Sequence, residues 1–102
     1  MNSSSAQPSG PSGHIERRVQ ALLERMTLPE KVGQMSQRNA SEGHPPDYLG
    51  AGLRAGHVGA VLNVAEVDAI NELQRIAVEE SRLGIPLLVG RDVIHGFRTI
   101  MP

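Results

Sequence analysis

Two short apolar runs restrict the fold of this chain more than any other feature of its sequence. Residues 57–64 (HVGAVLNV) and 86–90 (PLLVG) are typical of strands buried on both faces of a parallel sheet. Between them, residues 66–83 have the helical period, and Gly84 and Pro86 end the helix. This order predicts a β-α-β unit with parallel strands and a right-handed crossover. The predicted buried face of the helix consists of Val67, Ile70, Leu73, Ala77 and Val78.

Helices are expected before the first of these strands. Residues 15–26 (IERRVQALLERM) carry an apolar stripe at the helical period, with Arg and Glu on the opposite side. Thr27 and Glu30 have the spacing at which a hydroxyl and a carboxylate cap each other's backbone amides, so a second short helix is predicted there. We expect Met26 and Met35 to pack in the core. Residues 39–56 are interpreted as a loop with one helical turn at most, because they contain two consecutive prolines.

The predicted elements are too few for a closed parallel fold. Two strands and one crossover helix do not cover both faces of a sheet, and a closed (β/α)8 barrel needs about 250 residues. The chain has 102 residues, and residues 1–13 (MNSSSAQPSGPSG) have the composition of a disordered leader. The α/β pattern is therefore interpreted as the opening β-α-β portion of something larger, preceded by amino-terminal helices.

Composition excludes several functions. Ten basic residues balance eleven acidic ones, so no broad field attracts nucleic acid or an anionic membrane. The aromatic residues are Tyr48 and Phe97 alone, which excludes a base-stacking platform. Cysteine is absent and the four histidines are dispersed, so no metal site is predicted. No apolar segment of about 18 residues and no export signal is visible, which makes the cytoplasm the default location.

The densest polar cluster follows the second predicted strand. In α/β folds, functional residues lie just beyond the carboxyl ends of the strands, and Asp92 follows the run LLVG with only Arg91 between them. A carboxylate at this position accepts two hydrogen bonds, which suits a vicinal diol. The alternative is a structural ion pair between Asp92 and Arg91 or Arg98, with His95 bonded to a loop carbonyl. The paired charges Arg17–Arg18 and Glu79–Glu80 are expected to be solvated helix surface without a function.

A resemblance joins these segments. The run NELQRIAVEESRLGIPLLVGRDVIHGFRTI, residues 71–100, resembles family 3 glycoside hydrolases of the β-glucosidase kind. RVQALLERMTLPEKVGQM resembles their amino-terminal helices, and GHVGAVLNV resembles their first barrel strand. The similarity extends over residues 15–102, and GRDVIHG after an apolar strand is its most specific part.

The resemblance implies a (β/α)8 TIM-type barrel, of which residues 14–102 are the incomplete amino-terminal part, and a retaining β-glucosidase without a cofactor. Asp92 corresponds to the family's aspartate that binds hydroxyls of the terminal β-D-glucosyl residue, and Arg98 is expected to line the same pocket. The substrate is thus a β-glucoside or an oligosaccharide. The catalytic nucleophile and acid/base of the family are expected beyond Pro102, so this chain alone is expected to be inactive.

Two other functions stay open at this point. The β-N-acetylglucosaminidase branch of the same family has a DQEGGRV-like motif where this chain has RDVIHGFRT, which favours the glucosidase. A non-catalytic carbohydrate-binding fragment would keep Asp92 without hydrolysis. A periplasmic or secreted location of the full-length protein is the alternative to the cytoplasm.

Overall fold

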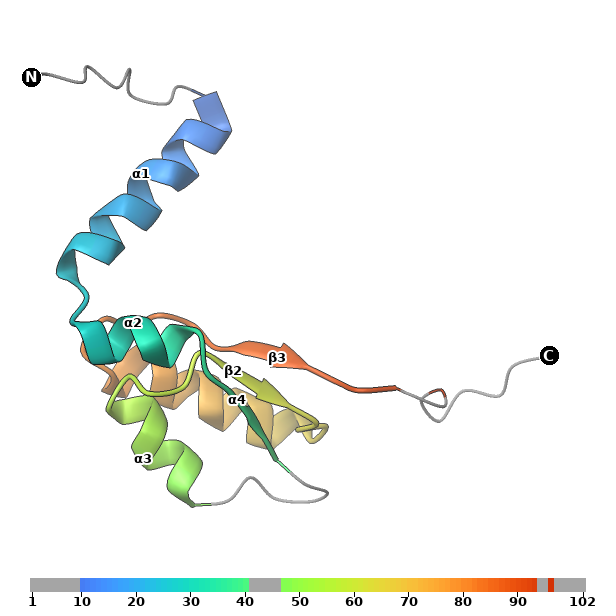
Figure 1. Cartoon of the computed structure of the whole chain (residues 1–102). Coiled ribbons are helices and arrows are strands. Elements are labelled where there is room, and N and C mark those ends of the chain that lie inside the picture. Colours follow the sequence, from blue (N-terminus) through green and yellow to red (C-terminus); the bar gives the residue numbers. More distant parts are fainter. Residues whose placement is uncertain (1–9, 41–46, 94–95, 97–102) are drawn as a thin grey trace, which may run out of the picture.

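A parallel three-stranded sheet with the order β1-β2-β3 is the centre of the fold (Figure 1). The computed structural model describes residues 10–40, 47–93 and 96. Along the chain the elements are α1 (Gly10–Arg25), α2 (Leu28–Gln34), β1 (Gln37–Asn39), α3 (Tyr48–Arg54), β2 (Ala60–Leu62), α4 (Val67–Arg75), the π-helical turn η1 (Ile76–Glu80) and β3 (Leu88–Gly90). The predicted β-α-β unit is confirmed as β2-α4-β3 with parallel pairing.

A second β-α-β unit precedes the predicted one and corrects the interpretation of residues 39–56 as a loop. β1 pairs in parallel with β2, with Arg38 opposite Val61. Its three residues are polar and exposed, so no apolar period marked it as a strand. The following helix α3 has seven residues. Its Leu49 and Leu53 lie one helical turn apart on the same face and are both buried, which stabilises the helix.

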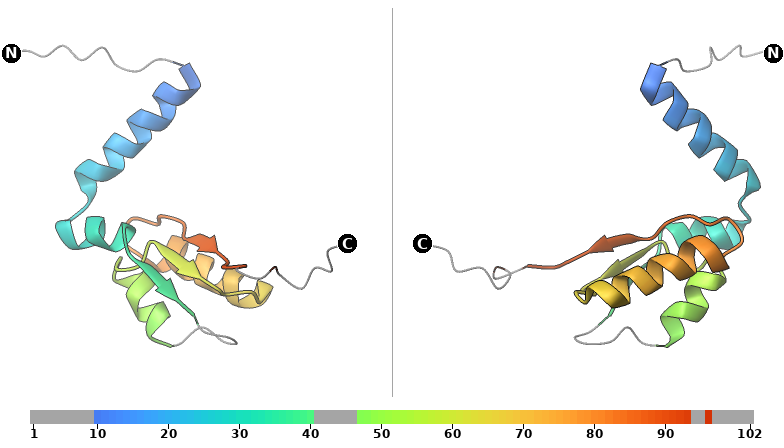
Figure 2. Two further views of the ribbon diagram at one scale, coloured as in Figure 1. Left: turned by 45° about the vertical axis from the view of Figure 1, so that its right-hand side comes forward. Right: turned by 180° about the vertical axis from the view of Figure 1, so that it is seen from behind.

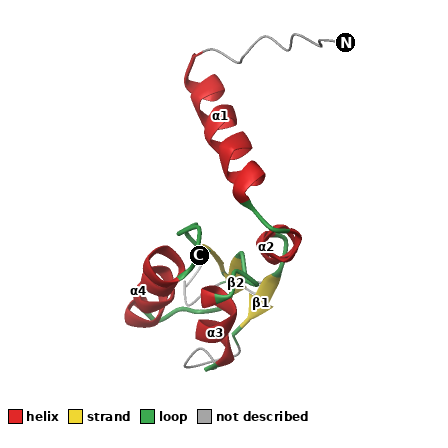
Figure 3. Cartoon of the chain, turned by 90° about the vertical axis from the view of Figure 1, so that its left-hand side faces the viewer, coloured by secondary structure: helices red, strands yellow, loops and turns green. Residues whose placement is uncertain are grey.

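The core lies on one face of the sheet. α3 and α4 with η1 cover that face, as the end-on view shows (Figure 3), and bury Val61 of β2 completely. The core cluster contains Ala40, Leu49, Leu53, Val58, Val61, Val64, Leu73, Ile76, Ala77 and Leu87.

The opposite face of the sheet carries no helix among the described residues. Because side chains alternate along a strand, Ala60 and Leu88 point to that face, and Leu88 is 75% exposed. Burial of both strands on both faces was therefore the wrong expectation for this chain.

α1 projects away from the sheet (Figures 1 and 2). It begins at Gly10, within the expected leader of residues 1–13, because Pro11 is compatible with the first helical turn. The predicted stripe is present but not buried, since Ile15 is 59% exposed. Met35 is 80% exposed, so its expected packing in the core is wrong, whereas Met26 is half-buried.

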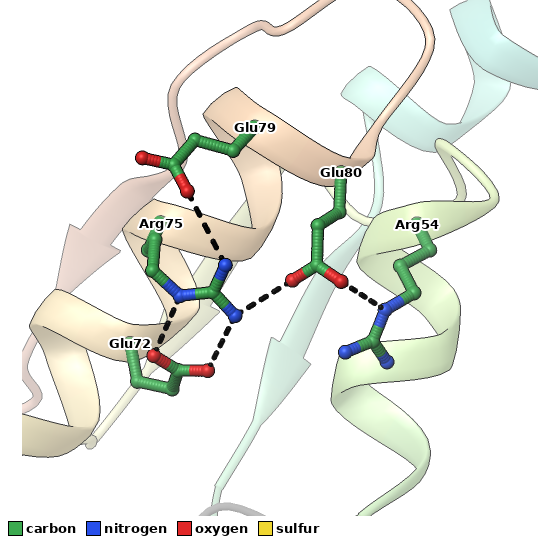
Figure 4. Close-up of polar contacts among 5 residues, drawn as sticks. All are labelled: Arg54, Glu72, Arg75, Glu79 and Glu80. Atoms are coloured by element: carbon green, nitrogen blue, oxygen red, sulfur yellow. Dashed lines mark hydrogen bonds and ion pairs between the residues drawn. The ribbon is translucent and has the colours of Figure 1, made fainter.

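The crossover helix ends in charged contacts. α4 stops at Arg75, and the wider winding of η1 brings Glu79 and Glu80 to the same guanidinium, at 3.3 and 2.7 Å (Figure 4). Glu80 also contacts Arg54 Nε of α3 at 3.2 Å, and these hydrogen bonds, first that of Arg54, lower the pKa of the Glu80 carboxyl. Glu80 therefore connects the α4-η1 segment to α3 in addition to being solvated, whereas Glu79 contacts Arg75 within the same segment.

Two residues of the predicted buried face of the crossover helix are exposed, contrary to expectation. Leu73 and Ala77 are buried, but Val67 and Val78 are 69% and 48% exposed. They lie toward the two ends of the α4-η1 segment, beyond the part that packs on the sheet.

α2 closes the amino edge of the sheet by backbone contact. A Cβ on Gly33 would lie 1.9 Å from the Gly56 carbonyl oxygen, and one on Gly59 would lie 2.3 Å from the Gln34 carbonyl oxygen. The Ser36 carbonyl accepts hydrogen bonds from the N–H groups of Gly59 and Ala60. Only glycine permits this approach, so α2 is held directly against the start of β2.

Polar contacts fix the start of α2. The predicted capping box is confirmed: the Glu30 N–H donates to Thr27 Oγ1 at 3.3 Å, and the Thr27 N–H donates to Glu30 Oε2 at 3.1 Å. Arg82 donates to both Glu30 carboxylate oxygens and to the Arg25 carbonyl. Arg82 is the main cause that lowers the pKa of the Glu30 carboxyl to about 2. One guanidinium thus joins the end of α1, the start of α2 and the segment after η1.

Candidate functional site

Polar residues gather at the carboxyl edge of the sheet. The parallel register places Asn39, Leu62 and Gly90 side by side at the ends of β1, β2 and β3. Asn63 and Asp92 follow directly after two of these strands. Carboxyl ends of parallel strands are where α/β folds carry their functional residues, so this edge is the candidate site.

Asn63 connects all three strand ends. Its backbone N–H donates to the Gly90 carbonyl at 2.9 Å, and its side-chain Nδ2 donates to Asn39 Oδ1 at 3.0 Å. Its Oδ1 accepts a hydrogen bond of 2.9 Å from the backbone N–H of Asp92. The loop that carries Asp92 is therefore attached to the central strand by the amide of Asn63.

The backbone of Asn63 is left-handed, with φ +71°. Among residues other than glycine, asparagine is one of the few that adopt this conformation readily. The left-handed turn ends β2 at Leu62, two residues before the end of the predicted strand region 57–64.

Asp92 lies where the sequence predicts it, two residues after β3, and its side chain is exposed. Its backbone N–H is held at the strand ends by Asn63. Arg91 is exposed beside it, and Gly96 has the positive φ of +85° that a tight turn after the strand requires. Arg98 and His95, the other predicted members of the cluster, lie outside the described residues.

An apolar depression lies elsewhere on the described part of the chain. It has a volume of about 430 Å³ and is bordered by α2, β1 and His57. Its lining is mostly apolar, and the described residues around it contain no carboxylate, so it offers no chemistry comparable to the carboxyl edge. Its lining residues are Leu28, Pro29, Val32, Gly33, Ser36, Arg38 and His57.

Residues 10–40, 47–93 and 96 contain no group of three or more His, Cys, Asp or Glu side chains placed to hold a metal ion. In the same ranges, no helix has the length and apolar character needed to cross a membrane.

The sequence interpretation missed Asn39 and Asn63. Asn63 interrupts the apolar run HVGAVLNV, and an asparagine at the end of a strand is a signal for a left-handed turn. Asn39 carried no such signal, because β1 itself was not predicted. Their proximity depends on the register of β1 with β2.

Comparison with known proteins identifies the class of protein to which these residues are related. No protein-family model matches the chain. A "Periplasmic beta-glucosidase" of Salmonella typhimurium is 36% identical over 84 residues, which cover 82% of this chain and 11% of the relative. "Beta-glucosidase C" of Emericella nidulans is 32% identical over 95 residues, with 81% of this chain and 15% of the relative covered.

A more distant relative is also named a beta-glucosidase. "Lysosomal beta glucosidase" of Dictyostelium discoideum is 28% identical over 101 residues, covering 76% of this chain and 12% of the relative. The chain is thus homologous to a part of the β-glucosidases, which confirms the β-glucosidase-like resemblance. It spans 11 to 15% of the length of these relatives.

Proposed function

We propose that this chain forms the opening strands and helices of the catalytic barrel of a family 3 β-glucosidase. The observation that carries the proposal is Asp92, which lies at the carboxyl edge of a parallel sheet in a chain homologous to β-glucosidases. The uncovered sheet face supports the barrel, because parallel sheets are stable when both faces are covered. In this proposal residues 14–102 belong to one barrel domain that continues beyond Pro102.

The proposed role of Asp92 is to bind the sugar. An exposed carboxylate has two oxygens that accept hydrogen bonds from neighbouring hydroxyls, and charged hydrogen bonds of this kind are strong. Arg98 is proposed to line the same pocket. The bound group is the terminal β-D-glucosyl residue of a glucoside or an oligosaccharide.

The proposed reaction is hydrolysis with retention. Such enzymes need a nucleophilic carboxylate and an acid/base about 5 to 5.5 Å apart across the glycosidic bond. We assign neither role to a residue of this chain, and we expect both beyond Pro102. No metal or organic cofactor takes part in this mechanism. The isolated chain is accordingly expected to be inactive, and poorly stable because its sheet has an uncovered apolar face.

The location of the full-length protein is part of the proposal. A relative with 36% identity is named periplasmic, which supports the periplasmic alternative over the cytoplasmic default.

The test is kinetics of the full-length protein on an aryl β-D-glucoside. We expect turnover by the wild type and a fall in kcat/KM of about 100-fold or more for Asp92→Ala, because two hydrogen bonds to a charged group are lost. Asp68→Ala, which removes an exposed carboxylate from the first turn of α4, is the matched control and should keep the wild-type value.

Three results would contradict the proposal. Wild-type kcat/KM in Asp92→Ala would exclude the proposed sugar contact. Faster turnover of an aryl N-acetyl-β-glucosaminide than of the glucoside would favour the glucosaminidase branch. A cooperative melt of the isolated chain with glucose-dependent shifts that vanish in Asp92→Ala would favour a carbohydrate-binding fragment.

A further inference from the structure

We infer that Asn63 is a positioning residue for Asp92, so that the amide of one strand end sets the position of the sugar-binding carboxylate on the next. The inference rests on the proposed function, because it concerns the same carboxylate. It starts from the 2.9 Å hydrogen bond between the Asp92 backbone N–H and Asn63 Oδ1.

The hydrogen bond to Asn63 holds Asp92, the residue whose position matters for the proposed binding of the sugar. β3 ends at Gly90, so Asp92 lies beyond the last ladder partner of its strand. The backbone hydrogen bond from Asn63 to the Gly90 carbonyl and the side-chain bond to the Asp92 N–H bracket Arg91. The two bonds together fix the direction in which the chain leaves the sheet, and the Asp92 carboxylate moves with that direction.

Hydrogen-bond chemistry settles the orientation of the Asn63 amide. The Asp92 backbone N–H is a donor only, so it requires the Asn63 oxygen and not the nitrogen. The nitrogen therefore points to Asn39, whose Oδ1 accepts at 3.0 Å. Asn39 thus acts as a second support, which keeps the Asn63 amide in the orientation that Asp92 needs.

The left-handed backbone of Asn63 allows the role of its side chain to be tested separately from the role of its backbone conformation. Glycine adopts a φ of +71° without strain, whereas alanine does not. Asn63→Gly therefore removes the amide and keeps the backbone, and Asn63→Ala removes both the amide and the relaxed backbone. A role in positioning and a role in turn stability then give different results.

The experiment is kinetics of the full-length protein on p-nitrophenyl β-D-glucoside. We expect Asn63→Gly to lower kcat/KM about tenfold with only a small change in melting temperature, because the two side-chain hydrogen bonds of Asn63, to Asn39 and from the Asp92 N–H, are lost while the backbone conformation is kept. Asn63→Ala should show the same loss together with a lower melting temperature. Asn71→Ala, at an exposed asparagine of α4, is the matched control and should keep the wild-type kinetics.

Conservative variants test the support from Asn39. A carboxylate in Asn39→Asp still accepts from Asn63 Nδ2, so this variant should keep more activity than Asn39→Ala, which has no acceptor. Asn63→Asp keeps an acceptor for the Asp92 N–H, so it should keep more activity than Asn63→Gly.

A double substitution shows whether Asn63 acts through Asp92. In the Asp92→Ala background, Asn63→Gly should cause no further loss of kcat/KM, because the carboxylate to be positioned is gone. Hydrogen exchange of the Asp92 amide should be faster in Asn63→Gly than in the wild type, which reports the lost bond directly.

The outcomes separate the two ideas. An active wild type with unchanged kinetics in Asn63→Gly, or a full tenfold additional loss in the double variant, overturns the inference and leaves the proposed function intact. A wild type that hydrolyses no β-glucoside overturns the proposed function and this inference with it.

Discussion

The two edges of the same small sheet are built in different ways. At the amino edge, α2 rests on β2 through Gly33 and Gly59, and Arg82 neutralises Glu30 beside it. At the carboxyl edge, single hydrogen bonds between polar side chains and backbone groups join Asn39, Asn63 and Asp92.

The amino edge is built for stability, whereas the carboxyl edge carries the polar groups that could bind a ligand. Backbone contacts at the amino edge leave no room for a side chain at Gly33 or Gly59, whereas the polar carboxyl edge leaves a carboxylate exposed. In (β/α)8 barrels, stability resides at the amino face and activity at the carboxyl face. If the proposed function holds, the sheet of this chain has the same division, and substitutions at its two edges should have separable effects.

The largest effect is expected for close packing at the amino edge. Gly33→Ala and Gly59→Ala should each lower the free energy of unfolding by about 3 kcal/mol or more, because the new methyl group overlaps backbone that cannot move aside. Soluble yield and urea unfolding of the full-length protein measure this. Gly50→Ala in α3, which meets only side-chain atoms, is the control and should be neutral or stabilising. Equal effects at Gly33 and Gly50 would contradict backbone packing.

A second effect concerns the entry to β3. Gln74 of α4 donates to the Leu87 carbonyl at 2.6 Å and accepts from the Leu87 N–H at 2.9 Å. Gln74→Met should cost about 2 kcal/mol, because both backbone groups lose their partner at similar side-chain volume. Hydrogen exchange of the Leu87 amide should then be faster. Gln20→Met on exposed α1 is the control, and an unchanged exchange rate at Leu87 would refute the role of Gln74.

A smaller effect is expected at the cap of α2. Thr27→Ala should destabilise the start of α2 by about 1 kcal/mol, since the Glu30 N–H loses its acceptor. Faster amide exchange at Glu30 is the readout. Thr27→Ser keeps the hydroxyl and should keep most of the protection. Equal exchange in the alanine and serine variants would show that the hydroxyl has no capping role.

The smallest effect is the pH dependence of the stability contributed by Glu30 at the amino edge. The pKa of the Glu30 carboxyl is lowered from 4.5 to about 2, so its ionised form stabilises the protein above pH 4.5. This contribution is lost as the pH falls from 4.5 toward 2. The difference in melting temperature between wild type and Glu30→Gln should therefore shrink over that range. A constant difference would mean that charge plays no part at the amino edge.

Much of the fold was predictable because it depends on local patterns. The stripe of residues 66–83 predicted α4, and Thr27 with Glu30 predicted the start of α2. β1 was not predictable in this way, because Gln37, Arg38 and Asn39 have no apolar period and form a strand only beside β2. The exposure of Leu88 was also unpredictable, since an apolar run reports what a strand is suited to contact and not what covers it.

The residues of the candidate site also differ in how far the sequence alone predicts them. Asp92 was predictable because its position after a strand is a local property of the sequence. The link to Asn63 was not, because it combines a left-handed backbone with a contact across 29 positions of the chain. Residues that hold a functional group in place through strand register leave little trace in a single sequence.

The two outer strands of the sheet differ in the side chains that they offer to a neighbouring strand. β1 consists of Gln37, Arg38 and Asn39, and such polar edges resist pairing with foreign strands. β3 presents Leu88 and Val89, both exposed, which are suited to accept a neighbour. The side chains of β3 therefore make that side of the sheet better suited to extension by another strand than the side of β1.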